Sequence, residues 1–208
     1  MKTVFLTAVV AIGLASCNNS TEKNAPKTAQ KTAEQTTTKI TNSDAETINA
    51  HIDVNKSLLH WHGTKAIGSG HKGEIKFEKG KIVVQDGLLK AGKFIVDMNT
   101  ISCTDIEDEK SNGNLVGHLK NEDFFDVANH PKASAEIIGA TIDESGVQKV
   151  DIMLTIKGVS LTQKASVEVV DKGEEVYVMG NLVFDRTKYG VTYNSKNFFD
   201  SLGDKIID

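Results

Sequence analysis

The 208-residue sequence contains only two cysteines and two prolines, and no apolar run reaches the roughly 18 residues that a membrane-spanning helix needs. Two cysteines cannot hold a disulfide-dense scaffold, and two prolines exclude a proline-rich disordered chain. Basic residues are fewer than acidic ones, 24 against 28, which argues against a nucleic-acid-binding protein, because such a protein presents a basic face. With 39% hydrophobic and 25% charged residues, the chain has the composition of one globular domain with a tail.

The N-terminus has the pattern of a bacterial lipoprotein leader. Lys2 precedes a short apolar run, Val4–Leu14, which is typical of a secretory signal. The Leu-Ala-Ser-Cys tetrapeptide that follows resembles a lipobox, in which an aliphatic and two small residues precede the cysteine that receives lipid. We therefore predict a signal peptide over 1–16 and lipid attachment at Cys17. The alternative is a plain signal peptide followed by a chance cysteine.

Residues 17–47 are predicted to be the lipidated cysteine and a flexible tether. The stretch is rich in Thr, Lys, Ala, Gln and Asn and contains almost no aliphatic side chains. It therefore cannot bury enough apolar surface to offset the entropy lost on ordering. The lipid anchor predicts location in the cell envelope. No Lys-Asp-Asp-like export signal follows Cys17, which favours a membrane anchor facing the periplasm.

From Ile48 onward, apolar and polar residues alternate with period two, which predicts β-strands. Five dipeptides ending in glycine are predicted to be turns between strands: Lys79-Gly80, Asp86-Gly87, Ser145-Gly146, Lys157-Gly158 and Lys172-Gly173. We predict one all-β domain over 48–208, an antiparallel meander of at least seven strands. Such a sheet closes into a barrel or folds into a sandwich, because open edges invite aggregation.

One segment departs from the strand pattern and predicts a short helix. Asn114–Glu122 has leucines at helical spacing, and Asn114 is a candidate N-cap. Phe124 and Phe125 follow, and we expect them to pack against one end of the sheet. The acidic residues that precede this segment, Asp105–Glu109, lack the glycine and glutamate of a calcium loop and predict a solvated loop.

Three histidines provide the main alternative to a non-catalytic protein. His60 and His62 share one face of a predicted strand, and with His71 they could form a zinc triad, although surface histidines flanking Trp61 are the simpler interpretation. The sequence at 68–73 matches the dinucleotide-binding pattern G-x-G-x-x-G, but a strand pattern rather than a helix follows it. Cys103 is predicted to be a small half-buried residue rather than a catalytic thiol.

Seven local strings, in this order, resemble the YceI-like family in the form common among lipoproteins of Bacteroidetes-type bacteria. The resemblance covers about residues 50–207. The strings are VNKS (54–57), WHGTK (61–65), GEIKF (73–77), GKFIVDMNTI (92–101), HLKNEDFFD (118–126), LTIKGVS (154–160) and DRTKYGV (185–191).

The resemblance implies an extended lipocalin-like barrel of eight antiparallel strands that holds a long apolar chain, of polyisoprenoid, isoprenoid-quinone or fatty-acyl type. Such a site needs no catalytic residue, cofactor or metal, because each buried CH₂ contributes about 0.8 kcal/mol. The side chains expected to line it are Trp61, Phe77, Phe94, Val96, Met98, Ile137, Leu154, Ile156, Val178 and Phe184, with Phe124 and Phe125 at the mouth. For each of them the alternative is ordinary core packing.

Asp185 and Arg186 are expected to form a structural ion pair near a barrel end, with a headgroup contact of Arg186 as the alternative. The resemblance implies one more alternating strand past 203–208, where this sequence stops, so either that strand is missing or it is supplied differently. A missing strand would leave an open edge, and an open edge leaves room for a homodimer. A structural or stress-response envelope protein with a solidly packed barrel is the remaining alternative function.

Overall fold

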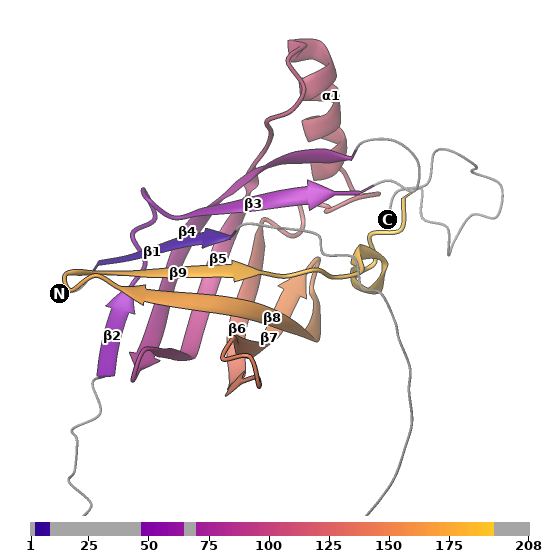
Figure 1. Cartoon of the computed structure of the whole chain (residues 1–208). Coiled ribbons are helices and arrows are strands. Elements are labelled where there is room, and N and C mark those ends of the chain that lie inside the picture. The colour runs from indigo at the N-terminus through magenta and orange to yellow at the C-terminus, as the bar shows by residue number, and fades with distance from the viewer. Residues whose placement is uncertain (1–2, 9–46, 65–69, 194–208) are drawn as a thin grey trace, which may run out of the picture.

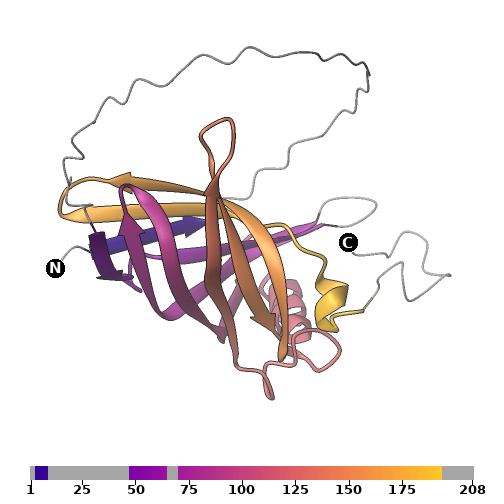
Figure 2. The same cartoon turned by 90° about the horizontal axis from the view of Figure 1, so that it is seen from below.

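The computed structural model describes residues 3–8, 47–64 and 70–193, and it is mostly β, with eight antiparallel strands curled into a half-barrel and one short helix (Figures 1 and 2). The predicted all-β fold class is confirmed. The strands are β1 (Thr3–Ala8), β2 (Thr47–His51), β3 (Leu58–Gly63), β4 (His71–Gln85), β5 (Leu88–Cys103), β6 (Lys132–Ile142), β7 (Gln148–Ile156), β8 (Val159–Asp171) and β9 (Glu175–Asn181). The helices are α1 (Glu109–Lys120) and a 3-10 helix, η1 (Arg186–Tyr189).

One curved sheet holds all the strands in the order β2-β4-β3-β1-β9-β8-β7-β6-β5, and β4 also pairs with β5. All pairs among β2–β9 are antiparallel, whereas β1 pairs in parallel with both β3 and β9. In this structure β1 thus fills the gap between β3 and β9. The sequence assigns residues 3–8 to a leader, and its removal stays a prediction. Cys17 and residues 17–46 of the tether lie outside the described residues.

The strands define two ends of the half-barrel, which we call the turn end and the helix end. The β4–β5, β6–β7 and β8–β9 turns lie at the turn end, where Thr47 at the start of β2 pairs with Gln85. The β7–β8 turn, α1 and η1 lie at the helix end. The chain therefore enters the domain from its N-terminal segment at the turn end.

Register places the apolar residues of each strand on one inner face. Phe94 on β5 is opposite Ala135 on β6, and Ala135 is opposite Leu154 on β7. Leu154 is in turn opposite Leu161 on β8. The period-two prediction is confirmed along these strands, because the inward positions are apolar and their sequence neighbours face outward.

The predicted turn at Lys79-Gly80 is wrong, because both residues lie inside the 15-residue strand β4. A register shift between Phe77 and Lys79 marks a bulge there. A Cβ at Gly80 would lie 2.9 Å from Cδ1 of Ile52 and of Phe94. The glycine therefore makes room for two core side chains and does not turn the chain. The other four predicted glycine turns do lie between strands.

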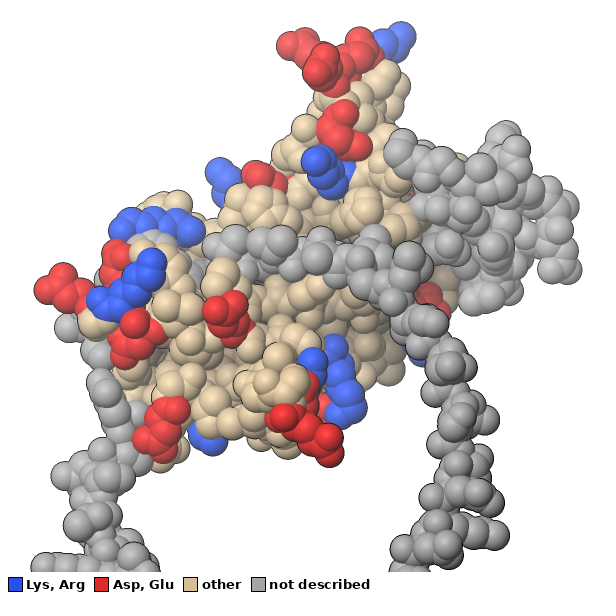
Figure 3. All heavy atoms as spheres, viewed as in Figure 1, with Lys and Arg blue, Asp and Glu red and all other residues tan. Residues whose placement is uncertain are grey.

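The helix begins earlier than the sequence predicted. Asp108, not Asn114, is the N-cap of α1, and its carboxylate accepts a hydrogen bond from the Ser111 amide at 2.8 Å. The helix ends at Lys120, two residues before the predicted end. The acidic run that was predicted to be a solvated loop thus supplies the cap and first turn, where carboxylates are favourable. Figure 3 shows acidic side chains at the outer tip of the helix. Neither helix of the described part could cross a bilayer.

Candidate functional site

The inner face of the sheet is the candidate site, and all twelve residues predicted to line it meet in one apolar cluster. Nine of them are buried: Phe77, Phe94, Val96, Met98, Phe124, Ile137, Leu154, Ile156 and Val178. Trp61, Phe125 and Phe184 are partly buried and pack against the others. The structure brings the predicted residues together, and ligand contact stays a prediction for each of them.

At the turn end the inward side chains are sealed from solvent. We call the five residues Ile82, Val84, Leu89, Val150 and Val176 the base cluster. Their relative exposure is between 0% and 2%. Packing of this density is typical of a protein core, so the base cluster acts as the structural floor of the half-barrel.

Gln148 closes the base cluster with a side-chain amide. Its Nε2 donates to the Leu89 carbonyl at 2.8 Å, and its Oε1 accepts from the Leu89 amide at 3.0 Å. Strand β6 pairs with β5 only as far as Ile137 opposite Gly92. The glutamine side chain therefore makes the two hydrogen bonds that the backbone of a neighbouring strand would otherwise make with Leu89. Sequence reasoning missed this residue, although a polar side chain at an apolar position of the alternation was a usable signal.

At the helix end several inward side chains stay partly exposed. We call the five residues Trp61, Phe125, Leu161, Leu182 and Phe184 the mouth cluster. Each packs against the apolar core but is only partly buried. Apolar surface that faces inward and still meets solvent is surface that an apolar ligand can cover. The mouth cluster is therefore the part of the inner face best suited to binding.

Trp61 is fixed at the mouth by its indole N–H, which donates to the Ser102 carbonyl at 3.0 Å. The strand that carries this tryptophan, β3, pairs with β4 through Gly73. A Cβ at Gly73 would lie 1.8 Å from the Ser102 carbonyl oxygen and 2.7 Å from the Trp61 Nε1. Gly73, the last glycine of the G-x-G-x-x-G string, therefore permits a close approach of strands, and the strand predicted after it is confirmed as β4.

A group of aromatic rings covers the helix end between α1 and η1. The Phe124 ring lies 5.0 Å from Phe125 and 5.8 Å from His118. The His118 ring also lies 4.3 Å from Tyr193. All these pairs are edge-to-face, the arrangement that aromatic quadrupoles favour. The predicted packing of Phe124 and Phe125 against one end of the sheet is confirmed.

Arg186 is buried and fixes the chain after η1 through backbone carbonyls. Its two terminal nitrogens donate to the carbonyls of Val191 at 2.7 Å and Tyr193 at 2.8 Å, and its guanidinium lies 5.3 Å from the Phe124 ring centre. Asp185 acts as the N-cap of η1, accepting from the Thr187 amide at 2.9 Å. These contacts give both residues structural roles near the barrel end.

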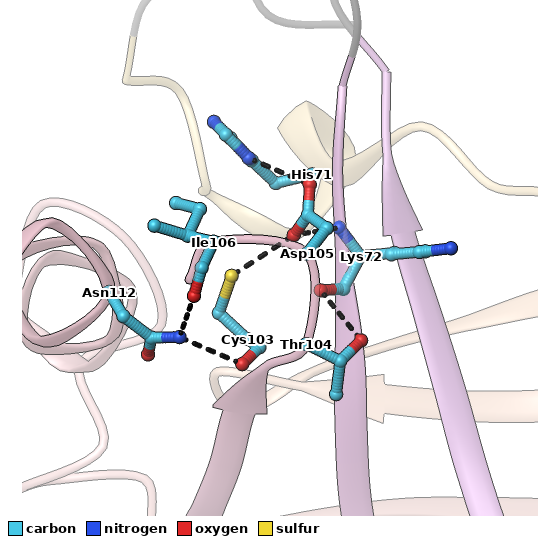
Figure 4. A network of polar contacts seen from close by, with 7 residues as sticks. All are labelled: His71, Lys72, Cys103, Thr104, Asp105, Ile106 and Asn112. Carbon is cyan, nitrogen blue, oxygen red and sulfur yellow. Dashed lines mark hydrogen bonds and ion pairs between the residues drawn. The ribbon is translucent and has the colours of Figure 1, made fainter. Parts of the chain in front are cut away.

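Asp105 joins three elements at the helix end (Figure 4). Its Oδ1 accepts from the Cys103 thiol at 3.1 Å and from the Lys72 amide at 3.2 Å, and its Oδ2 lies 3.1 Å from His71 Nδ1. Asn112 of α1 donates from its side-chain nitrogen to the Cys103 carbonyl at 3.0 Å. The network thus ties the start of β4 and the end of β5 to the helix.

The same contacts shift the pKa values of Asp105 and Cys103 in opposite directions. The thiol hydrogen bond from Cys103, helped by the Lys72 amide and His71, lowers the pKa of Asp105 to about 2. Burial, and then the hydrogen bond to Asp105, raises the pKa of the Cys103 thiol. A carboxylate beside a thiol opposes thiolate formation, so this arrangement favours the protonated thiol of Cys103, which is buried and not half-buried as predicted.

Two of the three histidines considered for zinc, His60 and His71, have carboxylate neighbours rather than a shared centre. His60 lies 3.7 Å from Glu74, and His71 pairs with Asp105 as described above. Within residues 3–8, 47–64 and 70–193, no group of three His, Cys, Asp or Glu side chains is placed to hold a metal ion. The geometry of the described residues therefore gives the zinc hypothesis no support.

Comparison with known proteins relates the chain to one family. The YceI-like domain family matches residues 49–207. The crystal structure of Burkholderia cenocepacia BcnA is similar, with 19% identity and a TM-score of 0.58 over 74% of this chain and 91% of that one. Two mutants of a CJ YCEI protein, one with a monobromobimane guest, share 19% identity over 59% of this chain and 70% of theirs, with a TM-score of 0.41. Among curated proteins there is no significant match.

Proposed function

The chain belongs to the YceI-like domain family, and we propose that it binds and carries a long apolar lipid of polyisoprenoid, isoprenoid-quinone or fatty-acyl type, without catalysing a reaction. The family is one of lipid- and polyisoprenoid-binding barrels. The observation that carries the proposal is the mouth cluster, whose inward apolar side chains remain partly exposed above a sealed base. An isoprenoid tail covering them would gain free energy from burial alone.

We propose further that the domain works in the cell envelope, anchored by lipid on Cys17 and facing the periplasm. The support is the lipobox-like sequence at 14–17. A flexible tether of this length has a root-mean-square span of about 30 Å, so the domain would stay close to the bilayer that holds its anchor. Mass spectrometry of the N-terminal peptide tests the anchor: a lipid-modified Cys17 is expected, and an unmodified N-terminus beginning at Met1 would refute it.

The central experiment is organic extraction of the purified chain followed by lipid mass spectrometry. We expect about one apolar lipid per chain. Leu161→Glu should abolish co-purification, because it puts a carboxylate among the mouth residues. The matched control is Thr162→Glu, which places the same charge on the exposed neighbouring position of β8. A folded protein that carries no lipid and takes up no added polyprenol would refute the proposal.

The second candidate function is a structural envelope barrel without ligand. The base cluster favours it, since a fully sealed interior needs no lipid to complete its packing. Both candidates predict the same fold, and they differ in the mouth cluster. Under the structural alternative, Leu161→Glu and Thr162→Glu would leave the lipid extract equally blank.

A further inference from the structure

The β7–β8 turn has an unusual residue at a left-handed position. Lys157 has φ of 49° and is followed by Gly158 at 76°. Two-residue hairpin turns with both residues at positive φ favour Asn-Gly or Asp-Gly, because most L-residues are strained there. In the described part of the chain the other non-glycine residues with positive φ are Asp86 and Asp126. A lysine held in this conformation points to a role for its side chain.

That side chain reaches from the barrel rim to the segment between α1 and β6. The Lys157 Nζ donates to the Glu122 carbonyl at 2.7 Å and to the Phe124 carbonyl at 3.2 Å. Hydrogen bonds from a charged donor are stronger than neutral ones. The two bonds tie the backbone on both sides of Asp123 to the β7–β8 turn.

The segment itself packs over the mouth. Phe124 is buried in the apolar cluster, and Phe125 belongs to the mouth cluster. On the helix side the segment is held by its own backbone, since the amides of Phe125 and Val127 donate to the Leu119 and Lys120 carbonyls. Lys157 holds it from the opposite side, at the turn between β7 and β8.

We propose that residues 121–126 form a lid over the helix end of the apolar interior and that Lys157 is the latch residue that keeps it closed. The apolar ligand then enters and leaves when the two latch bonds break and the freed lid also releases the bonds from the Phe125 and Val127 amides to the end of α1. The part of the inference that concerns ligand exchange rests on the proposed lipid-binding function. The closure of the lid itself does not.

Lys157→Gly tests the latch with little strain, because glycine adopts the same positive φ without steric clash and lacks the side chain that carries the ammonium. Asp86→Gly is the matched control. Asp86 has φ of 52° and precedes Gly87 at 73°, so the same backbone geometry occurs in the β4–β5 turn at the opposite end of the molecule. Both variants remove a side chain from a left-handed turn position, and only one removes the latch.

Two measurements on the full chain separate the lid from the ligand. Hydrogen exchange of the lipid-free protein should show roughly tenfold faster exchange at the Phe125 and Val127 amides in Lys157→Gly. Exchange at Val150 should not change, and Asp86→Gly should match the wild type at all three amides. Release of 11-(dansylamino)undecanoic acid, followed by fluorescence, should be about tenfold faster in Lys157→Gly alone.

The outcomes are distinct. Faster local exchange together with faster probe release supports the latch. Unchanged exchange at Phe125 and Val127 overturns it, whatever the probe does. If the lid amides respond but the wild type never binds the probe or a polyprenol, the lid stands and the proposed lipid-binding function fails. If both variants speed probe release equally, the effect belongs to turn flexibility and the latch is refuted.

Discussion

The two ends of the half-barrel use the same alternating pattern for different purposes. At the turn end the inward valines and leucines of the base cluster are sealed, and a glutamine amide completes the backbone pairing. At the helix end the side chains of the mouth cluster stay partly exposed beside the fully buried Tyr189 and Val191, and aromatic rings, a lysine and an arginine hold loops across this end. The base cluster therefore serves packing and the mouth cluster offers apolar surface for binding, although no difference in strand pattern separates the two clusters.

A leucine-to-alanine substitution should lower the free energy of unfolding much more in the base cluster than in the mouth cluster. Leu89→Ala removes a side chain that is 1% exposed and should cost about 2–5 kcal/mol of unfolding free energy. Leu161→Ala should cost about 1 kcal/mol, because its side chain is only partly buried. Urea denaturation of both variants measures the costs, and equal losses would remove the distinction between base and mouth.

Gln148→Leu should be the next most damaging change, at about 2–3 kcal/mol. It leaves the buried amide and carbonyl of Leu89 without the side-chain partner that satisfies both. The control is Gln163→Leu, since Gln163 makes one hydrogen bond, to the Tyr189 hydroxyl at 2.9 Å, and is partly buried. Thermal unfolding should place Gln148→Leu clearly below the control. The same melting temperature in both would mean that the Gln148–Leu89 pair is not structural.

Much of the fold could be predicted from the sequence, because the period-two alternation of apolar and polar residues indicates which side chains face inward. Dipeptides ending in glycine were ambiguous: Asp86-Gly87 turns the chain, whereas Lys79-Gly80 makes room for core side chains inside a strand. The difference depends on Ile52 and Phe94, which come from other parts of the chain, so the residues around each glycine cannot reveal which dipeptide is a turn. The helix start was missed because the Ser-Asn-Gly-Asn stretch after Lys110 has weak helix propensity.

For the site, the sequence supplied the apolar lining but not its division into base and mouth. Leu89 and Leu161 occupy equivalent inward positions in their strands, and only the three-dimensional packing separates them. The residues that hold the ends together were missed for a related reason. Lys157 bonds to backbone carbonyls and Asp105 accepts from a backbone amide and a thiol, all from other parts of the chain. Contacts of this kind produce no residue spacing that can be recognised in the sequence.

Acidification should weaken the helix end through Asp105. The folded-state pKa of Asp105 is about 2, below its ordinary value of 3.8. Its contribution is therefore fully present above about pH 5 and is lost as the pH falls through 3.8 towards 2. Asp105→Asn should lower stability at pH 7 by about 1 kcal/mol, given solvent screening, and should flatten the pH dependence over that interval. Denaturation curves at pH 7, 4 and 2.5 test this. An unchanged slope between pH 4 and 2.5 would contradict it.

The smallest effect should appear in thiol chemistry rather than in stability. Burial and Asp105 raise the pKa of Cys103, so its thiolate is scarce at neutral pH. Iodoacetamide at pH 8 should label Cys103 at least about tenfold more slowly in the folded protein than in guanidinium. Asp105→Asn should recover part of that rate. Labelling as fast as in the unfolded chain would show that the helix-end network does not shield the thiol.

The hydrogen bonds of the Gln148 side chain also bear on where the chain can accept an insertion. Since the Leu89 amide and carbonyl already have a partner in Gln148, the end of β6 in the β6–β7 hairpin, from Gly139 to Ile142, pairs with β7 and not with β5, whereas β7 also pairs with β8 from Gln148 onward. Figure 2 shows this hairpin projecting beyond the sheet. Ile138 and Ile142 on it are each 53% exposed. The tip at 143–147 is thus a natural insertion point, where a peptide epitope or a second domain could be grafted without disturbing the floor of the half-barrel.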